Sequence, residues 1–172
     1  ALRLGADQAQ LLHGAGISPL LLESELSRVT VPQYARLLRL LRRVTRDELW
    51  GLCARPLPVG SFAQVVRHAL RARTLGEAMR TGFTSYHLLL AQFVPRLRVQ
   101  GGVASVRMVT LGQRDDALDY AERVFSYFCY GVICWLVARR VPMQRVVYAS
   151  VGGVSDAALL YRAPVQLDMS YS

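Results

Sequence analysis

The sequence predicts an α+β fold, in which N-terminal helices are followed by a small antiparallel sheet packed on a long central helix. Apolar residues recur at helical spacing through the first half of the chain. Around Gly101-Gly102, β-branched residues alternate with polar ones, which is typical of a hairpin, and residues 124–138 form an apolar stretch suited to a buried helix. One domain over residues 1–172 is expected, because 172 residues, 52% of them apolar, can bury one sizeable core.

The first part of the chain, about residues 6–88, is expected to consist of short amphipathic helices. Residues 8–15 form the first, and Gly16 suits its end because glycine readily takes the left-handed conformation that closes many helices. After Thr30, apolar residues from Tyr34 to Leu41 recur at i, i+3, i+4 and i+7, while arginines take other positions. This pattern predicts a helix with one packed stripe and one solvated stripe.

Two pairs of residues mark further helix starts. The carboxylates of Asp47 and Glu48 suit the positive end of a short helix that would begin there. Thr74 precedes Glu77 by three residues, which is the spacing of a capping box. The helix that Thr74 starts is expected to end near Leu88.

From about residue 89 to residue 172 the pattern indicates strands around one long helix. An antiparallel hairpin is predicted from residues 88–100 and 103–111. A helix from Asp115 to about Arg140 follows, with acids at its start and arginines at its end, as the helix dipole favours. The remaining predicted elements are a strand over residues 144–151, a helical turn over 156–161 and a last strand over 165–171.

The charge of the chain does not by itself indicate a partner. The chain has 21 basic residues, all of them arginine, against 12 acidic residues, for a net charge of +9. The arginines form no block longer than a pair, which is typical of a solvated surface rather than of a nucleic-acid footprint. Three cysteines and the lack of a secretory signal indicate a cytoplasmic protein, and no segment is long and apolar enough to span a membrane.

No constellation of residues supports catalysis or a metal site. His13, His68 and His87 lie in separate segments, without a second ligand at helical spacing. Cys129 and Cys134 are five residues apart in the long helix, so they point in different directions and are expected to be core thiols. The sequence also lacks the glycine-rich motifs of nucleotide binding and of serine hydrolases. We therefore expect no enzyme activity, no metal and no cofactor.

Aromatic residues gather in the second half of the chain, and two interpretations of them stay open. One is core packing, the ordinary role of aromatic side chains on a buried helix. The other is a ligand pocket, in which buried polar tips of the long helix and arginines of the hairpin bind a carboxylated or phosphorylated molecule. The candidate ligand-binding residues are Tyr86, Phe93, Arg98, Arg107, Tyr127, Tyr130 and Trp135.

Five short segments follow one another in an order and spacing that resemble a known family. They are AGISPLLL at residues 15–22, TRDELWGL at 45–52, PVGSF at 58–62, TLGEAM at 74–79 and APV at 163–165. Together they are similar to the "arabinose-binding-like" N-terminal domain of AraC/XylS transcription regulators, over nearly the whole chain.

The resemblance implies a sensing and dimerising domain that responds to a small-molecule effector. It also implies control of promoter DNA through a C-terminal pair of helix-turn-helix motifs, which we expect to be absent from this chain. The expected partners are thus an effector of unknown identity, a second copy of the chain as a homodimer, and promoter DNA through the absent domain. Two alternatives stay open: a dimerisation module without an effector, and direct nucleic-acid binding through the basic surface.

Overall fold

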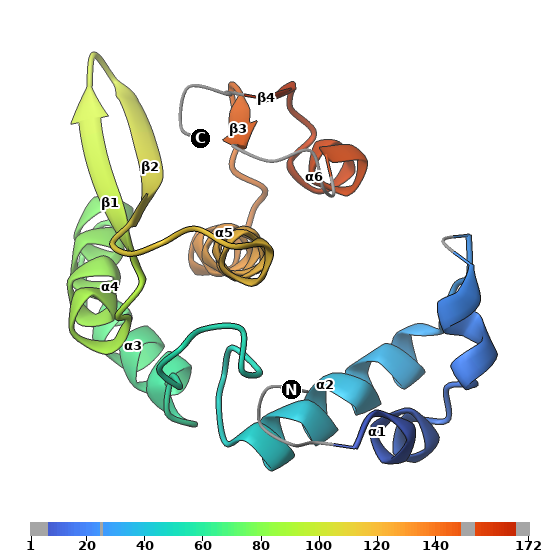
Figure 1. The fold of residues 1–172 in the computed structure, drawn as a ribbon. Coiled ribbons are helices and arrows are strands. Elements are labelled where there is room, and N and C mark those ends of the chain that lie inside the picture. Colours follow the sequence, from blue (N-terminus) through green and yellow to red (C-terminus); the bar gives the residue numbers. More distant parts are fainter. Residues whose placement is uncertain (1–6, 25, 149–153, 168–172) are drawn as a thin grey trace.

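The computed structural model describes residues 7–24, 26–148 and 154–167, and it confirms the predicted α+β fold (Figure 1). Helices occupy the N-terminal part, and a hairpin, a long helix and two short strands follow. The elements are α1 (Gln8–Ala15), η2 (Pro19–Glu23), α2 (Val31–Thr45), α3 (Ser61–Ala69), α4 (Leu75–Leu89), β1 (Phe93–Gln100), β2 (Val103–Thr110), α5 (Asp116–Leu136), β3 (Val146–Tyr148), α6 (Val154–Tyr161) and β4 (Val165–Leu167).

The α-helices α1 and α2 are bounded by capping residues. Gly16 ends α1 with a φ of 70°, as expected, because a left-handed residue lets its N–H reach back to the last turn. Thr30 and Gln33 form a reciprocal capping box at the start of α2. A small cluster of Leu12, Ala15 and Ile17 joins α1 to one side of α2, and no residue of α2 is fully buried. In Figure 1, α1 and α2 lie on the side of the molecule away from the hairpin.

The segment after α2 is held by two carboxylates rather than by a helix, so the predicted helix start at Asp47 and Glu48 is wrong. Asp47 is fully buried, and its carboxylate accepts hydrogen bonds from the backbone N–H groups of Leu49, Gly51 and Leu57 at 2.7–2.9 Å. The Glu48 carboxylate accepts hydrogen bonds from the N–H of Gly60 at 2.8 Å and from the N–H of Phe62 at 2.7 Å. The carboxylates bond a folded loop because its backbone has no regular partners of its own.

The predicted capping of α4 is confirmed in part. The Thr74 hydroxyl accepts from the N–H of Glu77 at 3.2 Å, as the spacing implies. The Glu77 carboxylate, however, accepts from the N–H of Arg73 rather than from that of the cap residue itself. The helix ends at Leu89, one residue beyond the expected position.

The hairpin is antiparallel, as predicted, and pairs Phe93 with Thr110 at its base and Gln100 with Val103 at its tip. Its base packs on α4 and α5, while most of β2 is exposed. Phe93 is completely buried there, together with Leu118 and Phe125 of α5. The small sheet is therefore anchored to the long helix at one end only.

The long helix α5 starts where the sequence predicts and ends earlier. Asp115 caps it by accepting from the N–H of Leu118 at 2.7 Å. It ends at Leu136, because Val137 leaves the helical region and Ala138 takes a φ of 52°. The arginines expected to close its last turn consequently lie beyond it, and Arg140 instead donates to the carbonyl of Leu160 at 2.7 Å. Among the described residues, no helix is long and apolar enough to cross a membrane.

Beyond α5, strands β3 and β4 pair in parallel through α6, with Val146 opposite Val165. The sequence predicted both strands but not this pairing. The outer parts of the two expected strands, residues 149–151 and 168–171, lie outside the described residues. Figure 1 shows α5 between the hairpin on one side and β3, β4 and α6 on the other.

We expect Asp47→Ala to lower the free energy of unfolding by roughly 3 kcal/mol or more, because three backbone N–H groups lose a charged acceptor inside the protein. Chemical denaturation followed by circular dichroism measures this change. Glu23→Ala, at an exposed position, is the matched control and should change stability by less than about 0.5 kcal/mol. Equal effects of the two substitutions would contradict the role assigned to Asp47.

Candidate functional site

The seven candidate ligand residues fall into three places in the structure. Tyr86 and Phe93 belong to the main core, where both rings pack edge-on against Phe125, at centroid distances of 4.7 and 5.4 Å. Arg98 and Arg107 are exposed on the hairpin. The structure thus does not bring these four residues together around one cavity.

The other three candidates lie on α5 but face different surroundings. Trp135 is 62% exposed near the end of the helix. Tyr127 and Tyr130 instead lie in a second core cluster, where both rings contact Tyr161 of α6, at centroid distances of 5.8 and 4.9 Å. The structure therefore brings together Tyr127 and Tyr130 and leaves Trp135 apart.

The second cluster lies against a different side of α5 from the main core. Phe125 and Tyr130 are five residues apart, so they are separated by roughly 140° around the helix axis. The side that carries Tyr130 faces Val146 and Tyr148 of β3 and the residues of α6 and β4. This position explains how one helix supplies the aromatic residues of two separate clusters.

Several hydroxyl groups meet inside this second cluster. Ser126 of α5 and Tyr161 of α6 share a hydrogen bond of 2.9 Å between their oxygens. The phenol of Tyr148 lies beside these two hydroxyls and beside Tyr127. We call Ser126, Tyr127, Tyr148 and Tyr161 the hydroxyl cluster. Its members come from three elements that are distant in the sequence.

The Tyr148 hydroxyl is the exceptional member of the hydroxyl cluster. Its oxygen is buried, and it has no hydrogen-bond partner of acceptable geometry among the described residues. Leaving a buried hydroxyl unpaired costs about 1–3 kcal/mol, so such a group points to a missing partner. Within the described residues, the Tyr148 phenol thus lies beside other hydroxyls but forms no hydrogen bond of good geometry with them.

Tyr148 and Tyr161 of the cluster are neutral hydrogen-bonding groups at physiological pH. Burial raises the pKa of Tyr148 and of Tyr161 above the usual value for tyrosine, chiefly because the phenolate would lose its hydration. Each phenol consequently keeps its proton and can both donate and accept. The arrangement is suited to recognition of a polar group rather than to proton transfer near neutral pH.

One cation lies close to this region. Arg140 sits beside the Tyr130 hydroxyl, which itself donates to the carbonyl of Val141 at 2.9 Å. The Arg140 guanidinium also donates to the carbonyl of Leu160, which ties the segment after α5 to α6. A guanidinium at the edge of a group of neutral hydroxyls favours a ligand with a carboxylate or another anionic group.

The cysteines near the cluster are not arranged for chemistry. Burial raises the pKa of Cys129 to about 12, so the thiol stays protonated and a poor nucleophile. The sulfur of Cys134 accepts from the N–H of Val141 at 3.4 Å, a packing role. Within the residues that the structure describes, no three His, Cys, Asp or Glu side chains gather in a way that could hold a metal ion.

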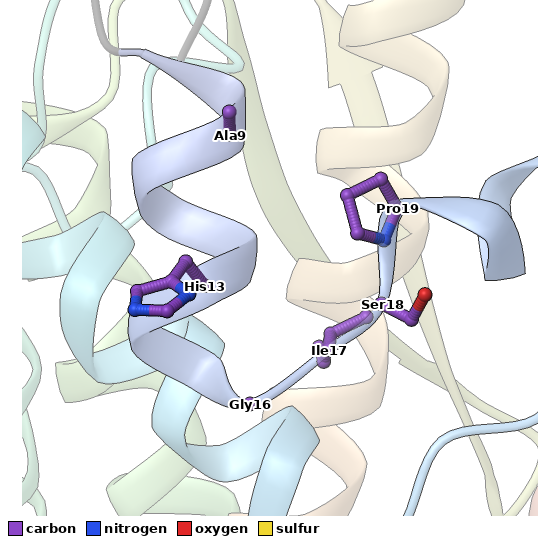
Figure 2. A pocket seen from close by; sticks show the side chains of 6 residues that line it. All are labelled: Ala9, His13, Gly16, Ile17, Ser18 and Pro19. Atoms are coloured by element: carbon purple, nitrogen blue, oxygen red, sulfur yellow. The ribbon is translucent and has the colours of Figure 1, made fainter.

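A hollow near the N-terminus offers less for binding than the hydroxyl cluster. It has a volume of about 420 Å³ and lies at the turn between α1 and η2 (Figure 2). The side chains of His13 and Ser18 point in different directions there, so no polar groups converge on one point. Ala9, Gly16, Ile17 and Pro19 complete its lining. Convergent polar groups are the usual mark of a ligand site, and this hollow lacks them.

Sequence reasoning missed Ser126, Tyr148 and Tyr161. The sequence indicated that buried tyrosines on the long helix need polar partners, but it did not indicate where in the chain those partners lie. Tyr148 and Tyr161 follow α5 in the chain, and only the parallel pairing of β3 with β4 brings them back onto it. The only sequence signal for this site was the presence of Tyr148, a residue with a polar hydroxyl, in a short apolar strand.

Comparison with known protein families gives a match over nearly the whole chain. The family model described as "Arabinose-binding domain of AraC transcription regulator, N-term" matches residues 5–172. This finding confirms the resemblance seen in the sequence. No curated protein matches the chain.

Tyr148→Phe should leave the stability of the ligand-free protein unchanged or raise it by up to about 1 kcal/mol, because it removes a buried hydroxyl that has no well-formed hydrogen bond to any described residue. Tyr161→Phe is the matched variant, and it should lower stability by about 1 kcal/mol because it breaks the bond to Ser126. Urea denaturation of both variants measures the difference. Clear destabilisation by Tyr148→Phe alone would show that the hydroxyl already has a partner.

Proposed function

Because the chain belongs to the family of N-terminal arabinose-binding domains of AraC transcription regulators, we propose that its hydroxyl cluster binds the effector of a promoter regulator. The family is one of ligand-binding regulatory domains rather than of enzymes. The observation that carries the proposal is the buried Tyr148 hydroxyl, which is left without a partner among the described residues. A ligand oxygen or nitrogen would supply that partner.

The effector that fits this site is a small molecule with one polar and one apolar part. The tyrosine rings of the second cluster offer apolar surface, and their hydroxyls offer donors and acceptors. Arg140 at the edge favours an anionic group. The word arabinose in the description of the family names no ligand for this chain.

We assign two of the seven candidate residues to this site, namely Tyr127 and Tyr130. The packing of Tyr86 and Phe93 against Phe125 supports a structural role for both. Roles for Arg98, Arg107 and Trp135 in ligand binding stay predictions. An effector held between the hairpin and α5 would need these three residues instead of the hydroxyl cluster.

Effector binding could be coupled to DNA binding because the hydroxyl cluster lies between α5, β3 and α6. The hydroxyl cluster joins α5 to β3 and α6, so a ligand that bonds Tyr148 favours one arrangement of these elements over another. We propose that this preference passes to promoter DNA through a DNA-binding domain that follows in the regulator, in the cytoplasm. No step of the proposal is catalytic.

The effector site can be tested by thermal unfolding of the chain with a panel of sugars, amino acids and aromatic or aliphatic carboxylates. A true ligand at one hundred times its Kd should stabilise the protein by about 2.7 kcal/mol. Tyr148→Phe should weaken that ligand about tenfold, equivalent to about 1.4 kcal/mol, whereas Arg98→Gln should not. The opposite pattern would place the ligand at the hairpin, and stabilisation by no compound would favour a module that only dimerises.

Dimerisation is the second part of the proposal, and apolar residues of the N-terminal part support it. Leu20 and Leu22 of η2, with Leu26 and Val31 after it, are 58–82% exposed. Exposed apolar residues that lie close together in one segment mark interaction surfaces more often than scattered ones do. A second copy of the chain would cover them in a symmetric dimer.

Substitution of both Leu22 and Leu26 by Glu should convert the dimer to a monomer, because two charges would be buried in the interface. Sedimentation velocity across a concentration series measures the change. Leu88→Glu, at an equally exposed leucine of α4, is the control and should leave the dimer intact. A wild-type chain that stays monomeric at high concentration would refute this part of the proposal.

A further inference from the structure

Four arginines that are dispersed in the sequence pattern come together on one face of α2 and its C-terminal cap. Arg39, Arg42, Arg43 and Arg46 follow the spacing i, i+3, i+4 and i+7, which places them in one row along the helix. All four are exposed, and together with Pro58 and Val59 they line a hollow of about 550 Å³. We call these four residues the arginine row. The sequence pattern suggested that the arginines are scattered over a solvated surface, whereas the fold brings these four together.

Among the described residues, no acidic side chain forms an ion pair with the arginine row. Residues 31–45, which form α2, include no Asp or Glu. The acids that follow it, Asp47 and Glu48, use their carboxylate oxygens to bond backbone N–H groups of the next loop. In the parts of the chain that the structure describes, ion pairs join Arg114 to Asp119 and Glu122 of α5, and none involves the arginine row. The row is therefore a local concentration of unpaired positive charge.

The arrangement places repelling charges next to one another, although the two arginines of the last turn, Arg42 and Arg43, also face the negative end of the helix dipole. Like charges three and four residues apart repel each other, and the row contains several such pairs, including Arg39 with Arg43 and Arg42 with Arg46. A ligand carrying several negative charges would turn this repulsion into attraction.

The opposite face of α2 is already in use. Leu37 and Leu40 pack on the cluster that joins α2 to α1, and the phenol of Tyr34 lies beside that of Tyr120 of α5. An amphipathic helix enters a membrane surface with its apolar face, which here is engaged within the protein. The arginine row is thus presented to solvent by a helix whose apolar side is held in place.

We propose that the arginine row binds the phosphate backbone of DNA. Seven residues of helix extend over about 10 Å, and duplex DNA carries a negative charge about every 1.7 Å of its axis, so the row can face several phosphates at once. Arginine binds phosphate oxygens through two parallel N–H groups, and such contacts position a protein without reading sequence. This role goes beyond effector binding, because it gives the sensing domain its own contact with DNA.

The test measures binding of the purified 172-residue chain to a fluorescein-labelled duplex of unrelated sequence, by anisotropy across a series of salt concentrations. The triple variant R39Q/R42Q/R43Q should bind at least tenfold more weakly at about 50 mM salt. Its plot of log affinity against log salt should also be shallower by about two to three, since each lost phosphate contact removes about 0.9 from the slope. Circular dichroism of the variant checks that it is folded.

The matched control is R98Q/R139Q/R145Q, which removes the same charge from exposed positions elsewhere. It should retain most of the affinity and of the salt slope. Equal losses in the two triple variants would overturn the proposal, because binding would then follow net charge alone. Binding that depends on the row with phosphatidylglycerol vesicles or with inorganic tripolyphosphate, but not with the duplex, would also overturn it.

Discussion

The packing of Phe125 against Tyr86 and Phe93 is the contact on which the arrangement of this domain depends. These edge-on contacts fix α5 against α4 and the base of the hairpin at centroid distances of 4.7 and 5.4 Å. Once that side of α5 is fixed, the side with Ser126, Tyr127 and Tyr130 must face β3 and α6. A core contact thereby decides where the candidate effector site lies.

The N-terminal helices connect to this core through backbone polarity more than through apolar packing. No residue of α2 is fully buried, yet the loop that follows it is held by the fully buried Asp47 carboxylate. An irregular loop has backbone N–H groups that no helix or sheet satisfies, and a carboxylate can serve several of them together. The same use of Asp47 and Glu48 leaves the arginine row without acidic partners. The hydrogen bonds that hold the loop after α2 therefore also influence the surface charge of α2.

The two proposed sites, the hydroxyl cluster and the arginine row, lie on different parts of the molecule and would bind their ligands through different interactions. The hydroxyl cluster is buried and neutral, because burial raises the pKa of Tyr148 and Tyr161. The arginine row is exposed and presents guanidinium groups to solvent. Tyr34 of α2 lies beside Tyr120 of α5, the helix that also carries Ser126 and Tyr127 of the hydroxyl cluster.

The sequence alone determined the elements whose signals are local. Gly16, Thr30 and Thr74 bound their helices as expected, the glycine pair placed the hairpin turn, and ordered segments identified the family. Tertiary structure alone decided the rest: the loop role of Asp47, the end of α5 at Leu136, the parallel pairing of β3 with β4, and the meeting of Tyr148 with Ser126 and Tyr161. The physical reason is that caps and turns satisfy backbone groups within a few residues. A buried carboxylate or hydroxyl bonds whichever distant group the packing brings to it.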